Sequence, residues 1–128
     1  MMWLVFVGAG LGGVARWGVG LWLPRTEAGA FPSATLVVNV VGCLVIGLVA
    51  GALAAGWREG WSGRDAVRAF VIVGLLGGFT TASSVAWETL QLASVSPARA
   101  LLYVMLTNTL GLGAAWSGLA AARALMAP

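Results

Sequence analysis

The chain has 128 residues, of which 60% are hydrophobic and only 9% are charged, and its mean hydropathy is +0.96. Soluble domains carry about 25% charged residues, so this composition excludes a soluble globular protein. The net charge of +3 comes from seven arginines and four acidic residues, without the basic cluster that would indicate nucleic acid binding. Cys43 is the one cysteine and histidine is absent, which excludes an internal disulfide and the usual zinc and haem ligand sets.

Apolar runs of about 20 residues, the length that an α-helix needs to cross a bilayer core, recur along the chain. They predict an all-α membrane protein, a single domain over residues 1–128, with transmembrane helices at about 2–23, 34–55, 66–92 and 98–124. The first run lacks a basic start and a clear cleavage site, so we interpret it as a retained span.

Arg16 lies well inside the first span, within a glycine-rich stretch that contains a G-x-G-x-x-G string. This string follows no strand, so it does not indicate a nucleotide site, and we expect its small residues to let another helix approach closely. Arg16 either snorkels to the membrane surface or lines an aqueous vestibule, where its charge attracts anions.

In the second span, for which Ser33 is the predicted N-cap, Asn39 is the one amide among apolar residues and needs a hydrogen-bonding partner. It either pairs across a helix interface or faces a polar path. After a predicted polar hairpin at 56–65, the third span carries GLLGGFTTASS at 74–84, with three glycines and four hydroxyls at its middle. Glycine lowers helix stability by about 1 kcal/mol per residue, so this pattern predicts a broken third helix. At such a break, exposed carbonyls would suit a hard cation, and hydroxyls would suit an anion. A glycine-lined helix contact is the alternative.

In the fourth span, Tyr103, Thr107 and Gly111 recur at intervals of four and form a polar stripe on one face. The stripe is either an ion track or interhelical hydrogen bonding. Beside the spans, Arg58, Arg64, Arg68 and Arg123 lie on the side of the N-terminus, and Arg25, Arg99 and a snorkelling Arg16 would lie on the other. This count weakly favours a cytoplasmic N-terminus. Because the numbers of arginines on the two sides are nearly equal, the chain could insert in either orientation.

Four segments together, in this order, resemble the CrcB/Fluc family of fluoride channels. They are GGVARW at 12–17, PSATLVVNVVG at 32–42, GGFTTASSV at 77–85, and Tyr103 followed by Thr107. The resemblance covers essentially the whole chain. It implies an antiparallel, dual-topology dimer in the inner (plasma) membrane, surrounded by membrane lipid, with two fluoride pores built from both subunits.

The resemblance also implies site residues. The backbone carbonyls of Gly77 and Thr80, with the same pair from the partner, would hold a structural Na⁺, a hard ion that suits neutral oxygen ligands. The implied fluoride pathway is lined by Asn39, Thr81, Ser83, Ser84, Tyr103 and Thr107, with Arg16 at the vestibule. Hydroxyl and amide hydrogens are the donors that can replace the water around fluoride.

One departure from the family pattern concerns its phenylalanine box, whose two aromatic positions are Ala82 and Val85 here. In the family, the electropositive ring edges face the passing anion. Either water or Phe79 substitutes for them, or the chain pairs with a sister subunit that has the rings, or it conducts poorly. We favour the sister subunit.

Two other functions compete with a fluoride channel. A small four-helix multidrug transporter shares the size and hydrophobicity, but it needs a membrane-embedded carboxylate for coupling, and the first span has none. A non-conducting structural partner subunit would explain the missing rings. An enzyme is not expected, because the sequence has no nucleophile–base pair, metal set or cofactor motif.

Overall fold

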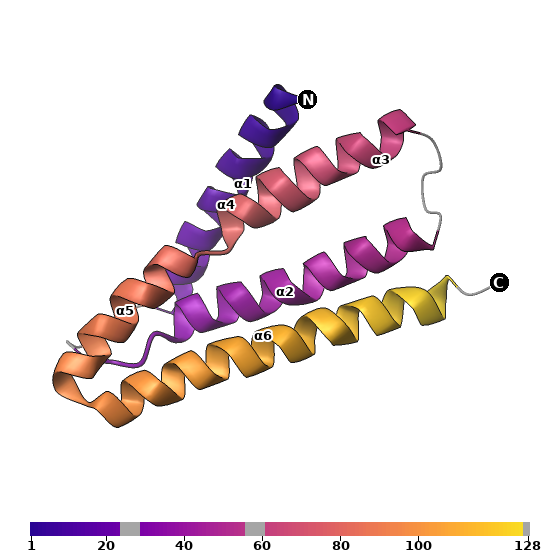
Figure 1. Cartoon of the computed structure of the whole chain (residues 1–128). Helices are drawn as coiled ribbons and strands as arrows, with labels where there is room; N and C mark the ends of the chain where they lie inside the picture. The colour runs from indigo at the N-terminus through magenta and orange to yellow at the C-terminus, as the bar shows by residue number, and fades with distance from the viewer. Residues whose placement is uncertain (24–28, 56–60, 127–128) are drawn as a thin grey trace.

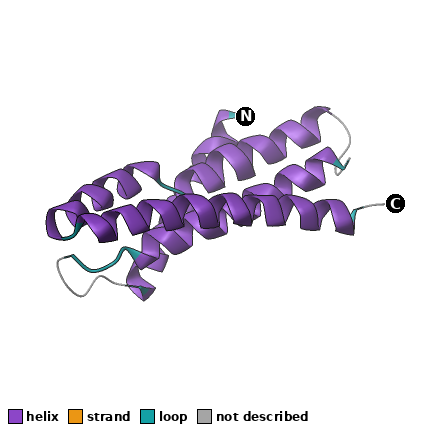
Figure 2. Ribbon diagram, turned by 60° about the horizontal axis from the view of Figure 1, so that its bottom comes forward, coloured by secondary structure: helices purple, strands orange, loops and turns teal. Residues whose placement is uncertain are grey.

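The computed structural model describes residues 1–23, 29–55 and 61–126, without the side chains of residues 61 and 62. The regular secondary structure of this part of the chain is all helical, and short loops connect the helices (Figure 2). Four helical segments are long and apolar enough to cross a membrane: Met2–Trp22, Ser33–Ala54, Gly63–Val95 and Pro97–Leu125. The prediction of four spans in an all-α chain is therefore confirmed. Residues 24–28 and 56–60, which hold Arg25, Arg58 and much of the two expected connections, lie outside the described residues.

The third span is bent and consists of several pieces. The other spans are single helices: α1 (Met2–Trp22), α2 (Ser33–Ala54) and α6 (Pro97–Leu125). The third contains α3 (Trp61–Val67), the π-helical segment η1 (Arg68–Leu76), the short α4 (Gly77–Phe79) and α5 (Ala82–Val95). The chain is non-helical between α4 and α5, so the predicted break lies within the third span. Its helical part begins at Trp61, five residues before the expected start at 66.

The helices form two arms that diverge from each other (Figure 1). In one arm α2 packs along α6, and in the other α1 packs along η1 and α4. Beyond the break, α5 turns onto α6, so the third span connects the two arms. The centre of the molecule is therefore the place where the third span changes from one arm to the other.

Close backbone contacts between α1 and the third span depend on glycine. A Cβ atom at Gly12 would overlap the carbonyl oxygen of Leu75, and one at Gly78 would overlap the carbonyl oxygen of Ala9. The expectation that the glycine-rich stretch of the first span lets another helix approach is confirmed.

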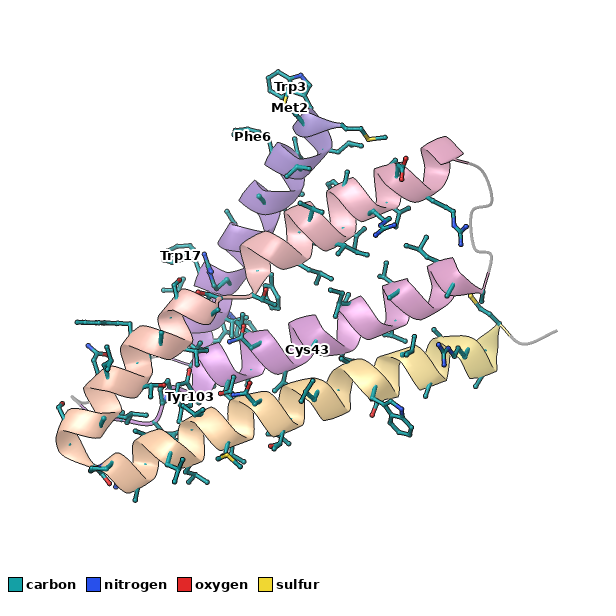
Figure 3. All side chains as sticks on the ribbon, in the orientation of Figure 1. Met2, Trp3, Phe6, Trp17, Cys43 and Tyr103 are labelled. Carbon is teal, nitrogen blue, oxygen red and sulfur yellow. The ribbon has the colours of Figure 1, made fainter. Side chains whose placement is uncertain are left out.

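Large apolar side chains cover the outside of the protein, as a lipid-facing surface requires. On α1, Trp3 is 79% exposed, Phe6 72% and Trp17 67%, and they project from the outer side of the helix (Figure 3). The described core is small and lies between α5 and α6, where Leu92, Ala100 and Tyr103 are buried together. Because this core is small, much of the packing consists of close contacts between helix backbones at glycine positions.

Two hydroxyls cap helices, but not the one that the sequence predicted. The Thr81 side chain accepts a hydrogen bond from the Ser84 amide at the start of α5, and the Ser96 side chain accepts one from the Arg99 amide at the start of α6. The prediction that Ser33 caps the second span is wrong: Ser33 is the first helical residue of α2, and Pro32 occupies the capping position without a side-chain bond. Capping residues have an extended backbone, which Thr81 and Ser96 adopt.

We expect Gly118→Ala to destabilise the protein, because a Cβ at Gly118 would overlap the carbonyl oxygen of Leu44 and force α6 away from α2. Overpacking of this kind costs about 1–3 kcal/mol, which outweighs the gain of up to about 1 kcal/mol in helix propensity. Gly113→Ala on the same helix is the control, since a Cβ at Gly113 meets nothing within 4 Å. Unfolding by SDS in detergent micelles measures both; equal stabilities would contradict the proposed contact.

Candidate ion pathway at the helix break

The break consists of two residues with extended backbones. Thr80 has φ −79° and ψ 159°, and Thr81 has φ −154° and ψ 111°. The last turn before them is closed by the Thr80 amide, which donates to the Leu76 carbonyl at 2.9 Å, and the Thr80 hydroxyl donates to the same oxygen at 2.8 Å. A continuous helix would pair the Thr81 amide with the Gly77 carbonyl, but at the break this amide has no such partner within its own span.

Asn39 of α2 supplies the missing partner. Its Oδ1 accepts from the Thr81 amide at 2.9 Å, and its Nδ2 donates to the Thr81 carbonyl at 3.3 Å. The side-chain amide thus pairs with both backbone groups of one residue, as a neighbouring strand would. Of the two interpretations that the sequence left for Asn39, pairing across a helix interface is realised, and the second Nδ2 hydrogen is left for another acceptor.

The Thr81 side chain connects the break to the next helix. Besides capping α5, its hydroxyl donates to Ser84 Oγ at 3.0 Å and lies 3.2 Å from Ser83 Oγ. Thr81 is buried, Ser84 is half-buried and Ser83 is exposed. Three residues expected on the fluoride pathway therefore form one hydroxyl cluster at the start of α5.

Arg16 of α1 points towards the break. Its Nη1 donates to the Thr80 carbonyl at 3.3 Å. This contact directs the Arg16 side chain towards the middle of the third span, where Thr80 lies, and not towards the membrane surface. A positive charge therefore lies beside the extended backbone.

A cavity of 560 Å³ opens beside the break, between α2, the third span and α6. It is lined by seven of the predicted residues: Asn39, Gly77, Thr80, Thr81, Ala82, Val85 and Thr107. Ser83, Ser84, Tyr103 and Arg16 are outside the lining. The described lining residues are all uncharged, and so the cavity offers hydroxyl and amide groups without a carboxylate.

Thr107 carries the clearest unused polar group on this cavity. Its Oγ1 is buried and has no hydrogen-bond partner in the described part of the chain. The neighbouring hydroxyls of α6 differ, because Thr109 donates to the Met105 carbonyl at 2.7 Å and Ser117 donates to the Gly113 carbonyl at 2.8 Å. A buried hydroxyl without a partner costs about 1–3 kcal/mol, so this group needs a partner that the described part of the chain does not supply.

Further along α5, two hydroxyl groups surround Glu88, an acid that was not predicted as a site residue. Glu88 accepts from the Tyr103 hydroxyl at 2.6 Å and from the Thr35 hydroxyl at 2.8 Å. Tyr103 is fully buried, and its ring packs edge-on against Phe31. The available signal was that Glu88 is the one carboxylate inside the expected third span, 66–92, and lies four residues after Ser84, on the same helix face.

The carbonyls of Gly77 and Thr80 can be tested as ligands for the implied Na⁺. In a continuous helix the Thr81 amide would donate to the Gly77 carbonyl, but here it donates to Asn39, so the Gly77 oxygen is released. The Thr80 oxygen already accepts from Arg16 and has a second lone pair. Both residues line the cavity, and the released Gly77 carbonyl suits a hard monovalent cation, whereas at the Thr80 carbonyl the bound Arg16 guanidinium would repel one.

Known proteins resemble this chain over most of its length. The family model described as "CrcB-like protein, Camphor Resistance (CrcB)" matches residues 3–119. A protein of Methylobacterium nodulans, named fluoride-specific ion channel FluC, is 39% identical over 123 residues, covering 94% of both chains. Proteins of the same name from Rhizobium etli and Methanopyrus kandleri are 40% and 36% identical, covering 95% and 92% of this chain and 95% and 86% of their own.

We expect Asn39→Leu to destabilise the fold as well as abolish ion flux, since both backbone groups of Thr81 would lose their partner inside the membrane. Each unpaired group costs about 1–3 kcal/mol, giving a loss of about 2–6 kcal/mol in an SDS unfolding titration. Asn108→Leu is the control for stability, because Asn108 is exposed and its hydrogen bond in the described part of the chain is to the Val104 carbonyl of its own helix; since Asn108 also lines the cavity, it is not a control for flux. If the two variants were equally stable, Asn39 would not hold the break.

Proposed function

Because the chain belongs to the CrcB-like family, we propose that it is a subunit of a fluoride-selective channel that lets fluoride leave the cytoplasm and so reduces its toxicity. The family is one of fluoride channels and not of enzymes. Four helices are long and apolar enough to span a membrane, so the chain is a multi-pass membrane protein. Export of fluoride from the cytoplasm requires a channel in the inner (plasma) membrane, and we place the protein there.

The observation that carries this proposal is the buried, unpaired hydroxyl of Thr107 beside an uncharged cavity. A dehydrated fluoride ion needs hydrogen-bond donors and is repelled by carboxylates. Thr107 and the second amide hydrogen of Asn39 are donors on that cavity. The hydroxyl cluster of Thr81, Ser83 and Ser84, followed by Tyr103, continues the pathway along α5, and Arg16 adds positive charge at the break.

An antiparallel second subunit completes this pathway. Gly77 and Ala82 are exposed in the single chain, although both lie at the centre of the membrane span. A partner inserted in the opposite orientation would cover them and bring its own carbonyls to those of Gly77 and Thr80. Bound there, Na⁺ would join the two broken helices through neutral oxygen ligands.

The partner that best fits this chain is a sister subunit with aromatic residues at the positions of Ala82 and Val85. Ala82 and Val85 both line the cavity, and because neither has a ring, this chain offers an anion no ring edge at these positions. The number of arginines on each side of the membrane also favours a sister subunit. Arg16 is bound at the break, so it is not counted among the arginines at the outer surface. Four arginines against two then favour a cytoplasmic N-terminus, and an antiparallel dimer needs a partner of opposite orientation.

A non-conducting structural subunit is the remaining alternative, and one assay separates it from the proposal. The small multidrug transporter is less favoured: the one described acid in the middle of a span, Glu88, already accepts two hydroxyl hydrogen bonds and does not line the cavity. A coupling carboxylate has to exchange a proton for a cationic substrate.

We expect liposomes containing this chain alone to release fluoride slowly, and Ala82→Phe to raise the rate. Ala82 is the position of choice because it is exposed, whereas Val85 packs against the core around Tyr103 and would be overpacked by a ring. A fluoride electrode measures efflux for the parent, the variant, and the parent mixed with a ring-carrying sister subunit. Rapid fluoride-selective efflux from the parent would defeat the sister-subunit interpretation, and no efflux from any preparation would defeat the channel.

In whichever of these preparations conducts fastest, Thr107→Val should lower fluoride efflux about 10- to 100-fold without destabilising the protein. A hydrogen bond to an ion is worth about 1.5–3 kcal/mol, and the lost hydroxyl has no partner in the folded chain. Thr109→Val is the matched control, because Thr109 is exposed and bonds to its own helix. A large loss of stability in Thr107→Val with unchanged efflux would assign the hydroxyl to the fold.

A further inference from the structure

A second cavity, of 460 Å³, lies away from the helix break. It is located between the end of α2 and α3, where the two arms diverge (Figure 1). It is enclosed by the C-terminal end of α2 on one side and by α3 and the start of η1 on the other. Its walls divide by chemistry into an apolar part, formed by Ala50, Leu53, Ala54 and Ile72, and a charged part, formed by Arg64, Asp65 and Arg68.

The two arginines are placed to act together. Arg64, Arg68 and Ile72 follow one another at intervals of four residues, so they form one row along the helix that faces α2. Arg64 Nη2 donates to the Leu53 carbonyl near the end of α2. This bond fixes the guanidinium at the cavity and uses one of its five N–H donors.

The cavity lies at the depth of the lipid headgroups. The 22 residues of α2 span about 33 Å, which is slightly more than a hydrocarbon core of about 30 Å. The end of α2 at Ala54, and with it the charged part of the cavity, therefore lies at the membrane surface, and the apolar part lies deeper. Two arginines and one aspartate leave this site with a net positive charge.

We propose that this cavity binds an anionic glycerophospholipid, with the headgroup phosphate between Arg64 and Arg68 and an acyl chain along Ala50 and Ile72. Charge complementarity selects the anionic headgroup, because guanidinium groups bind phosphate through paired N–H donors. The apolar wall selects a lipid over free phosphate, which would leave that wall uncovered. Basic pockets between membrane helices bind lipid headgroups in the same manner.

The test compares lipid binding to the detergent-purified protein by native mass spectrometry. Phosphatidylglycerol should bind to the parent more tightly than phosphatidylcholine does. Each arginine near the headgroups contributes about a fivefold factor, so Arg64→Gln with Arg68→Gln should weaken phosphatidylglycerol binding roughly 25-fold. The matched control, Arg99→Gln with Arg123→Gln, removes the same charge from exposed positions outside the cavity and should bind as the parent does.

Two further measurements keep the proposal falsifiable if the double variant does not fold. Asp65→Asn removes the one negative charge of the cavity and should tighten phosphatidylglycerol binding several-fold. An excess of inorganic phosphate should leave the bound lipid in place. Equal binding of the two lipids, equal weakening in the control, no effect of Asp65→Asn, displacement by phosphate, or a parent that binds no lipid because a second subunit fills the cavity would each overturn the proposal.

Discussion

An interrupted helix inside a membrane has to find partners for its backbone groups within the protein, and the pairing of Asn39 with Thr81 meets this requirement. The rest of the packing brings the partners close enough. A Cβ at Gly42, one turn from Asn39 on α2, would overlap the Thr80 side chain, and a Cβ at Gly12 of α1 would overlap the Leu75 carbonyl. Glycines on two helices and one amide thus act together to hold a short extended segment at the centre of the span.

This arrangement explains why the sequence predicted the fold well and the partners of its polar groups less well. Long apolar runs and the glycine–hydroxyl stretch of the third span depend on local chemistry, and they indicated the four helices and the break. The partner of Asn39 depends on how α2 meets the third span, which a pattern along one helix does not contain. For the same reason Ser33 was predicted as a cap from its residue type alone. The capping residue Thr81 is held extended by its contact with Asn39, and Ser96 is held extended by Pro97, which follows it.

The two arms bury little of their surface against each other, and the exposed part is of two kinds. The tryptophans of α1 face outwards, where lipid suits them. Gly77 and Ala82 are exposed beside the break, where released carbonyl and hydroxyl groups make lipid contact unfavourable. The second kind of surface requires protein, water or ions, and so the site at the break is not complete in a single chain. The antiparallel partner proposed above would meet this requirement with the same elements that create it.

The directions of the hydrogen bonds along α5 place a further condition on an anion that follows the hydroxyl pathway. Near the break, Thr107 has an unused donor, and an ion can bind there without breaking an internal bond. Around Glu88 the situation is reversed, because the hydrogens of Tyr103 and Thr35 already point to the carboxylate. Fluoride can be bound by Tyr103 only if that hydroxyl turns away from Glu88, and the carboxylate then repels the ion at close range. In the proposed pathway, the region near Thr107 would attract the anion and the region near Glu88 would repel it, and conduction requires binding that is favourable enough to enter and weak enough to leave.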